Sequence, residues 1–297
     1  MTWQSIYSRP GRWLKGNLHT HTTQSDGQLT PEQAAIRYRD QGYDFVAISD
    51  HWVHTSSLAV DGMTTVPAAE LDGQGYHMLA LGLQSLPAKE QADDPQAMID
   101  HVLSEQGMAF IAHPYWTGQT SHAIAQLHGL LGIEVFNSVC DVTKATGYAR
   151  VHWDDLLAEG HRLLGLAVDD VHWRFGAQGR GFIMVRSEDS SDQAILAAIR
   201  EGAFYSSMGP TIADLWLTPG SEDTAPKLHV RASPCRTISF FASGPRGQRS
   251  DADQGGTIET ASIGVTPDQV YLRVECCDAL GRTAWSNPIY VQDLLQS

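Results

Sequence analysis

The sequence predicts an α/β barrel followed by a small all-β domain. Apolar runs alternate with helical segments over about the first 212 residues, and helix signals then disappear. The length of 297 residues suits one large domain and one small domain. We therefore expect residues 1–212 to form the barrel and residues 213–297 to form a β-sandwich.

The expected strands of the first part are short apolar runs. Several are continuous hydrophobic blocks rather than alternating patterns, which is typical of parallel strands covered on both faces. The runs are Trp13–His19, Asp44–Asp50, Thr64–Glu70, Tyr76–Leu83, Met108–His113, Gly132–Asn137, Leu163–Asp169 and Gly181–Arg186.

Helices are expected between these runs. The best-marked start is Thr30-Pro31-Glu32-Gln33, which combines an N-cap, a proline at the first helical position and a capping box. A second helix opens at Asp94-Pro95, and two more cover Trp153–Glu159 and Ser191–Glu201. All four stop at a glycine, namely Gly42, Gly107, Gly160 and Gly202. Repeated strand–helix units favour an α/β barrel.

Beyond residue 213, glycine, proline and serine separate short runs without helical periodicity. Alternation of apolar and polar residues is clear in Tyr271–Glu275. This pattern is typical of a small antiparallel β-sandwich. The expected strands are Asp214–Thr218, Lys227–Ala232, Thr237–Ala242, Val270–Cys276 and Ser286–Val291.

Composition excludes several classes of protein. The net charge is −14 and no basic stripe is visible, which argues against binding to long nucleic acid. No apolar run reaches the roughly 18–20 residues that span a bilayer, and the N-terminal residues lack the apolar core of a signal peptide. The four cysteines form no Cys-x-x-Cys pair. We expect a cytoplasmic protein with free thiols and no membrane partner.

Side chains that bind metals recur at the ends of consecutive expected strands. His19 and His21 point the same way, because side chains alternate along a strand. The carboxyl ends of barrel strands converge on one mouth, where active sites of this architecture lie. Imidazoles mixed with carboxylates favour borderline divalent metals over magnesium or calcium. The other such residues are Asp26, His51, Glu70, His77, His113, Asn137, Asp169, Asp170 and His172.

These segments resemble the motifs of the PHP (polymerase and histidinol phosphatase) superfamily of metal-dependent hydrolases. The matching segments are LHTHTTQSDG, AISDH, AAE, AHP and AVDDVH, and the resemblance covers about residues 13–212. GAFYSSMGP and WSNPIYV resemble a branch with a C-terminal β-sandwich, which is similar to predicted phosphoesterases and carbaryl-hydrolase-like proteins. The resemblance implies a distorted seven-stranded (β/α) barrel with two or three zinc, manganese or iron ions.

Motif by motif, the resemblance also implies a set of metal ligands. Asp170 is preferred over its neighbour Asp169, because the family motif is Asp-x-His. Glu134 is a further candidate, since some members place a ligand in that strand. The implied ligands are His19, His21, Asp26, His51, Glu70, His77, His113, Asp170 and His172.

The expected reaction is hydrolysis of a small phosphomonoester or nucleotide by a hydroxide that bridges two ions. His51, Asp26 or His172 would protonate the leaving oxygen, and Arg180, Lys144 and Arg174 are candidates for holding the phosphate. Two alternatives stay open. One is hydrolysis of a carboxylic or carbamate ester by the same metals, and the other is a non-catalytic protein that binds a small molecule or carbohydrate. The sandwich could also mediate an oligomer.

Overall fold

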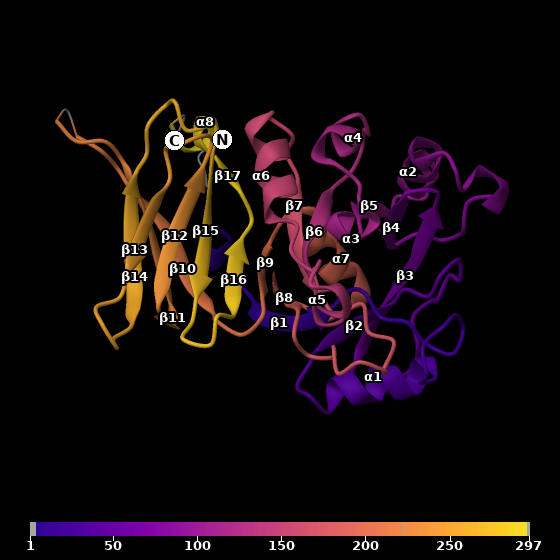
Figure 1. Ribbon diagram of the computed structural model, residues 1–297. Coiled ribbons are helices and arrows are strands. Elements are labelled where there is room, and N and C mark those ends of the chain that lie inside the picture. Colours follow the sequence, from indigo (N-terminus) through magenta and orange to yellow (C-terminus); the bar gives the residue numbers. More distant parts are fainter. Residues whose placement is uncertain (1–3, 222, 296–297) are drawn as a thin grey trace.

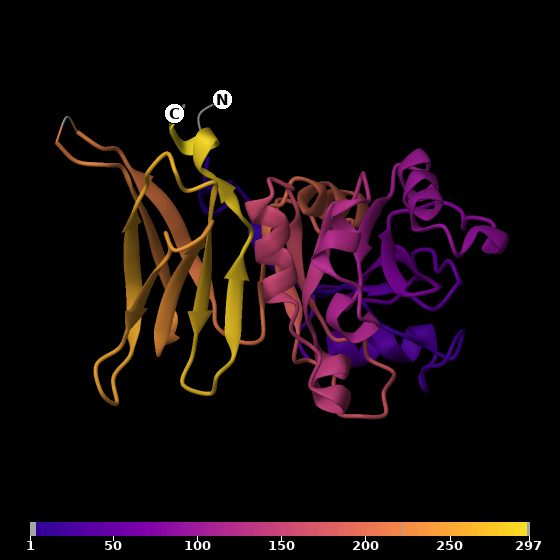
Figure 2. The same cartoon turned by 45° about the horizontal axis from the view of Figure 1, so that its top comes forward.

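The architecture has two parts that lie side by side (Figure 1). The computed structural model describes residues 4–221 and 223–295. One part combines strands with most of the helices, whereas the other consists almost entirely of antiparallel strands, a division that is also clear from a second direction (Figure 2). Along the chain, the change from one kind of structure to the other follows β9 (Phe204–Ser207).

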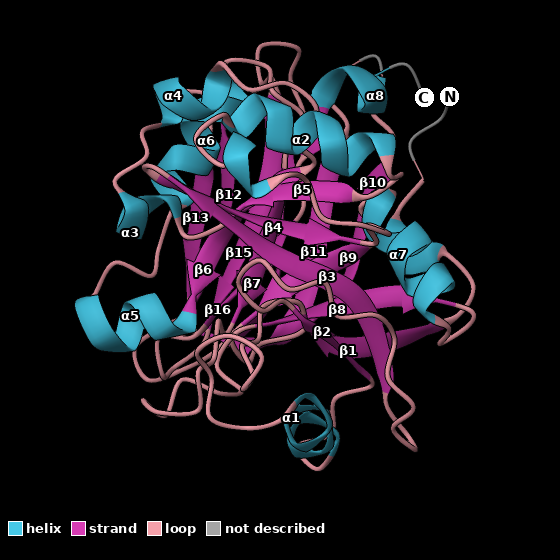
Figure 3. Cartoon of the chain, turned by 90° about the vertical axis from the view of Figure 1, so that its right-hand side faces the viewer, coloured by secondary structure: helices cyan, strands magenta, loops and turns pink. Residues whose placement is uncertain are grey.

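Four helices form close to where the sequence predicts them, and they lie around the strands (Figure 3). Thr30 accepts a hydrogen bond from the backbone N–H of Gln33, and the Gln33 side chain accepts one from the Thr30 N–H, so the predicted capping box is formed. The four are α1 (Pro31–Arg39), α2 (Pro95–Ser104), α6 (Arg150–Ala158) and α7 (Asp192–Arg200). Short helices that the sequence did not predict are α3 (Pro114–Thr117), α4 (Ser121–Ala125) and α5 (Ser138–Lys144), with 3-10 turns η1 (Ile6–Ser8) and η2 (Lys89–Gln91).

The strands of the α/β part pair in the order β9-β8-β1-β2-β3-β4-β5-β6-β7. They are β1 (Arg12–Asn17), β2 (Phe45–Ile48), β3 (Thr64–Gly73), β4 (Tyr76–Leu81), β5 (Met108–Ile111), β6 (Gly132–Asn137), β7 (Leu164–Val168), β8 (Phe182–Ser187) and β9. Four of these strands, β2, β5, β6 and β9, are buried along their whole length, as continuous apolar runs predict.

This sheet is mixed rather than parallel throughout. The pairs β1–β2, β2–β3, β5–β6 and β6–β7 are parallel. By contrast, β4 runs antiparallel to both β3 and β5, and β8 runs antiparallel to β1 and β9. In the β3–β4 hairpin, Asp72 lies opposite His77. A residue near the start of β4 therefore lies beside the carboxyl end of β3.

The chain that follows β7 pairs with the chain that follows β1. Thr20 and Val171 form a parallel bridge, the His21 N–H donates to the Val171 carbonyl over 3.0 Å, and the Asp170 N–H donates to the His19 carbonyl over 2.9 Å. Segments far apart in sequence are thus joined at one end of the strands. One hydrophobic core cluster takes side chains from several of these strands; it includes Leu14, Phe45, Leu79, Phe110, Leu166 and Ile183.

The remaining strands form two antiparallel layers. The strands β10 (Ile212–Thr218), β11 (Lys227–Cys235) and β14 (Ile258–Gly264) make a three-stranded sheet. The other layer contains β12 (Thr237–Ala242), β13 (Gln248–Asp251), β15 (Tyr271–Cys277), β16 (Thr283–Ser286) and β17 (Ile289–Tyr290), and the short helix α8 (Val291–Leu295) follows it. One hydrophobic cluster takes side chains from both layers, among them Leu215, Val230, Phe240 and Val274.

The two parts share a sheet and a buried junction. Strand β16 pairs with β9, so the second layer continues the sheet of the α/β part. Arg273 on β15 is fully buried, and its guanidinium Nε donates to Asp154 of α6 over 2.7 Å. The Tyr271 hydroxyl donates to the same carboxylate over 2.8 Å. Among the described residues, no helix has the length and apolar character needed to cross a membrane.

Candidate metal centre

Side chains at or just after the carboxyl ends of β1, β3 and β7 converge on one buried point. His19 and His21 lie just after β1 with their Nε2 atoms 3.1 Å apart. Glu70, near the carboxyl end of β3, places Oε2 3.2 Å from His19 Nε2 and 3.1 Å from His21 Nε2. Asp170, just after β7, places Oδ1 3.3 Å and 3.0 Å from the same two nitrogens. We call His19, His21, Glu70 and Asp170 the inner cluster; all four are buried.

The spacing and bonding of the inner cluster fit a bound cation. An ion about 2.0–2.1 Å from four nitrogen or oxygen ligands in a tetrahedron holds them about 3.3–3.4 Å apart. The distances above, 3.0 to 3.3 Å, lie close to that value. Moreover, Asp170 Oδ1 is buried and accepts no hydrogen bond of acceptable geometry, although two imidazoles lie next to it. A buried carboxylate oxygen without a hydrogen bond calls for a cation.

Glu70 faces two sets of imidazoles with its two oxygens. Its Oε2 contacts the inner-cluster histidines and lies 3.2 Å from His51 Nδ1. Its Oε1 lies 2.8 Å from His77 Nδ1 and 3.2 Å from His113 Nε2. His77 reaches this point because β4 runs antiparallel to β3. This carboxylate is therefore placed to bridge two cation positions.

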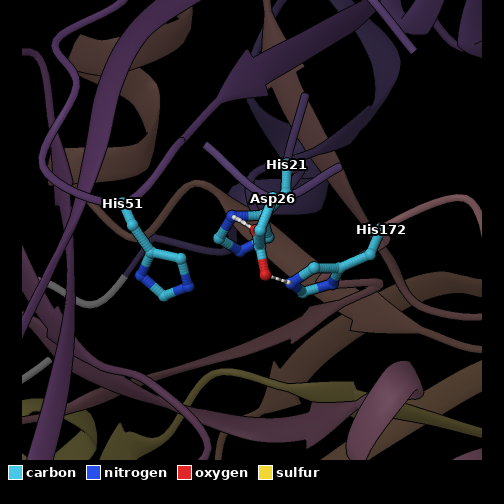
Figure 4. Close-up of side chains that lie close together, drawn as sticks. All are labelled: His21, Asp26, His51 and His172. Atoms are coloured by element: carbon cyan, nitrogen blue, oxygen red, sulfur yellow. Dashed lines mark ion pairs between the residues drawn. The ribbon is translucent and has the colours of Figure 1, made fainter. Parts of the chain in front are cut away.

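A second group of side chains lies nearer the solvent. The Asp26 carboxylate lies between two imidazoles, with Oδ2 3.1 Å from His172 Nε2 and Oδ1 3.5 Å from His21 Nδ1 (Figure 4). His51 completes this group. We call Asp26, His51 and His172 the outer cluster. Side-chain exposure is 48% for Asp26, 28% for His51 and 16% for His172, against at most 6% in the inner cluster. The outer cluster is thus the part that a substrate can reach.

The backbone turns sharply at several of these positions. The φ angle is 53° at Asp170 and 27° at His113, both of which are predicted ligands. It is also positive at Trp52 and Trp173, which directly follow His51 and His172. Residues other than glycine rarely adopt such angles, and each costs of the order of 1–3 kcal/mol. The strand ends therefore accept strain that aims side chains into the site.

The electrostatics show two buried carboxylates in need of positive charge. Burial alone would lower the pKa of His21, but the Asp170 and Glu70 carboxylates, 3.0 and 3.1 Å from its Nε2, outweigh it and raise that pKa to about 9. Burial alone would raise the pKa of Glu70, but the charge of His19 and hydrogen bonds from the surrounding imidazoles hold it well below its usual value. Imidazolium protons provide the compensating charge when no ion is bound. Divalent ions would take their place, because metal ligands must be deprotonated.

Several residues around the site were left open or missed by sequence reasoning. Glu134 Oε1 lies 2.6 Å from His19 Nδ1, and its Oε2 accepts from the His113 N–H over 2.8 Å. It thus orients two predicted ligands and is itself placed for a metal with them. Asp72, which sequence reasoning missed, lies 3.0 Å from His51 Nδ1. Its only signal in the sequence is its place two residues after Glu70, on the same face of the strand.

The adjacent residues Asp169 and Asp170 point in different directions and have different partners. The Asp169 carboxylate accepts hydrogen bonds from the Tyr38 hydroxyl and from the N–H groups of residues 179, 180 and 181, so it holds a loop. Asp170 points into the inner cluster. Asp50 also holds a loop, since it accepts from the N–H groups of Thr22 and Ser25 ahead of Asp26. Its signal is its place directly before His51, on the opposite face.

A pocket of about 700 Å³ opens above the site. Among the residues predicted to bind substrate, Lys144 and Arg174 line it. Arg180 is not part of this lining, and its guanidinium lies 3.7 Å from Asp141 instead. Because β8 runs antiparallel to β1, the start of β8 lies beside the carboxyl end of β1, so Arg180 is at the same end of the sheet as the site. All nine predicted ligands lie within the cluster or beside it; their role as ligands stays a prediction.

Comparison with solved structures finds proteins of similar fold. A two-domain protein from Bacteroides vulgatus, containing a predicted PHP-like metal-dependent phosphoesterase, aligns over 94% of this chain and 95% of its own, with a TM-score of 0.52 and 14% identity. A candidate metal-dependent phosphoesterase from Bifidobacterium adolescentis aligns over 53% of this chain and 87% of its own, with a TM-score of 0.37 and 17% identity.

An amidohydrolase from Chromobacterium violaceum, solved with bound sulfate and no metal, aligns over 64% of this chain and 96% of its own, with a TM-score of 0.39 and 13% identity. The last two similarities are too low to support an argument. No protein-family model and no curated protein matches the sequence. The chain therefore has the fold of a two-domain protein with a PHP-like part, in agreement with the resemblance of its motifs to the PHP superfamily.

Proposed function

We propose that this protein is a metal-dependent phosphoesterase that acts on a small phosphomonoester or nucleotide. The observation that carries the proposal is the buried group of two imidazole nitrogens and two carboxylate oxygens, 3.0 to 3.3 Å apart, whose Glu70 extends to a second set of imidazoles. The mixed nitrogen and oxygen donors suit two or three zinc, manganese or iron ions. The similar fold of the Bacteroides vulgatus protein, which contains a predicted phosphoesterase, supports the same reaction class.

Divalent ions at these positions supply the Lewis acidity that activates water and neutralises charge on a phosphoryl group. The protein contributes the positioning. Glu70 and Asp170 have fixed orientations among the imidazoles, and Glu134 holds His19 from behind. Because these side chains are buried, little reorganisation is needed when charge develops on the substrate.

The outer cluster is proposed to handle the proton of the leaving group. His172 and His51 are partly exposed at the pocket, and Asp26 faces His172. Burial alone would raise the pKa of Asp26, but the hydrogen bond and charge of His172 outweigh it and lower that pKa to about 2. Asp26 is therefore a carboxylate at neutral pH. It orients the imidazole, which is the group placed to donate to a leaving oxygen.

The two cations of the pocket wall favour an anionic substrate. Lys144 lies in the last turn of α5, and Arg174 donates a hydrogen bond to the Asp26 carbonyl. Both line the pocket into which the two clusters open. A pocket of this kind suits a small molecule, whereas the net charge of −14 opposes long nucleic acid.

The test compares hydrolysis of p-nitrophenyl phosphate and p-nitrophenyl acetate by protein loaded with Mn²⁺ or Zn²⁺. Phosphate hydrolysis is expected to dominate, to vanish on chelation, and to fall at least 100-fold in Asp170→Asn together with bound metal, measured by elemental analysis. His122→Ala removes an exposed histidine of α4 and serves as the matched control. Preferred hydrolysis of the acetate would favour the ester-hydrolase alternative. Unchanged turnover and metal content in Asp170→Asn would contradict the assigned site.

A further inference from the structure

The walls of the pocket differ in chemistry from its floor. The floor carries the two clusters, and the other lining residues are mostly apolar. Thr143 adds little polarity, because its hydroxyl donates within α5 to the Val139 carbonyl over 2.5 Å. The wall residues are Trp116, Val139, Cys140, Val142, Thr143, Lys144, Arg174 and Phe175. Apart from Lys144 and Arg174, the walls offer few hydrogen-bonding groups, which suits an apolar ligand body and does not suit a sugar that needs many polar partners.

Exposed aromatic side chains gather at this pocket. Among large hydrophobic side chains that are exposed in the described part of the chain, three are aromatic: Tyr115, Trp116 and Phe175. Trp116 is 46% exposed and Phe175 is 54% exposed, and both line the pocket. Exposed aromatic surface at a concave site usually marks a contact with a ligand or partner.

The indole of Trp116 is held against the metal floor. It packs edge-on against His113, with ring centroids 5.1 Å apart, and against His77, with centroids 5.5 Å apart. Its backbone N–H donates to the His113 carbonyl over 2.9 Å, which fixes the turn of α3. A leaving group that extends from the floor toward α3 therefore meets a positioned ring.

The other walls come from separate segments. Phe175 follows the His172 loop, so it lies on the side of the outer cluster. Val139 and Val142 belong to α5, whose N-cap Asn137 donates through Nδ2 to Glu134 and to Asp170. The apolar face of α5 is thus anchored to the same residues that form the floor.

We propose that the preferred substrate is a phosphomonoester of an aromatic alcohol, whose ring packs between the walls formed by Trp116, α5 and Phe175 while the phosphoryl group lies on the floor. This inference rests on the proposed function and narrows it. Stacking on one aromatic side chain, together with its burial, amounts to about a tenfold gain in affinity.

The experiment uses metal-loaded protein with 2-phenylethyl phosphate and ethyl phosphate, whose leaving alcohols are of similar acidity. We expect kcat/KM for phosphate release to be at least tenfold higher for the phenylethyl ester, through a lower KM. Trp116→Ala and Phe175→Ala should each reduce that ratio about fivefold. Tyr115→Ala removes a neighbouring exposed ring that does not line the pocket, and it should preserve the ratio.

Binding separates this inference from the proposed function. Calorimetry uses metal-loaded protein with 2-phenylethylphosphonate and ethylphosphonate, whose phosphorus–carbon bond is not hydrolysed. The affinity should be about tenfold higher for the phenylethyl compound, and Trp116→Ala should reduce this preference as it does for the esters. Equal affinity for the two phosphonates, or a preference that survives both substitutions, would overturn the inference. If neither ester is hydrolysed while the phosphonate preference holds, the phosphoesterase proposal fails and the aromatic site stands.

Discussion

Glu134 contacts His19 from the side that faces away from the inner cluster, through Nδ1. A carboxylate in this position fixes the ring orientation and raises the basicity of the opposite nitrogen. We expect Glu134→Gln to weaken metal binding about 10–100-fold without abolishing it. Competition with a coloured chelator measures the affinity, and His122→Ala is the control. An affinity equal to that of the unaltered protein would show that Glu134 does not act on the centre.

The raised pKa of His21 predicts how the metal-free protein responds to pH. Its pKa is about 9 in the folded chain and 6.5 in an unperturbed histidine, so folding strengthens proton binding. The resulting stability is fully present below about pH 6.5 and is lost as pH rises toward about 9. Urea unfolding of chelator-treated protein at these two pH values should show the decrease. It should be smaller in His21→Asn, and an equal decrease in that variant would contradict the assignment.

At the scale of elements, the cap of α1 has a stability consequence that can be measured. Thr30 and Gln33 satisfy each other's backbone N–H groups, and Tyr38 on this helix donates to Asp169. Thr30→Ala should destabilise the protein by about 1 kcal/mol, because the backbone N–H of Gln33 loses its partner. Thermal unfolding of the metal-free protein should show a melting temperature lower by about 2–4 °C. Thr30→Ser, which keeps the hydroxyl, should retain most of the stability.

Helices with marked ends could be predicted from sequence, whereas strand direction could not. The N-caps of α1, α2 and α7 leave local signals that need no knowledge of the fold. The reversed direction of β4 depends on the tight hairpin after β3, and an apolar run looks the same in either direction. Predicting the position of His77 was correspondingly uncertain, because the hairpin alone brings it to Glu70.

At the scale of the whole molecule, two ion pairs of opposite character connect the two parts. Arg273 is fully buried and contacts Asp154 and Glu275, whereas Arg162 and Asp293 are about half exposed. Arg273→Met should destabilise the protein by about 1.5–3 kcal/mol, since Asp154 and Glu275 lose charge-assisted hydrogen bonds from a buried guanidinium. Arg162→Met should cost less than about 1 kcal/mol. Urea unfolding of both variants checks this, and similar losses would contradict the role of the buried pair.

Composition predicts a division of the chain near residue 213, which stays a prediction, and it gives no sign that β9 and β16 belong to one sheet. Pairing of β9 with β16 joins residues about 80 positions apart, and no local pattern encodes such a partner. The candidate site was largely predictable, because ligand-type residues sit at strand ends. Its supporting residues, such as Glu134 and Asp72, lacked a signal of that kind.

The double role of Glu70 has a consequence for how the centre can vary. Because one carboxylate faces both His19 and His113, neither half can change its charge or geometry without disturbing the other. If ions fill two positions of the proposed centre, the first would remove negative charge from the second, so that successive loadings would be interdependent. Because Glu70 is common to both halves, a substitution in either half would alter the charge and geometry of the whole centre.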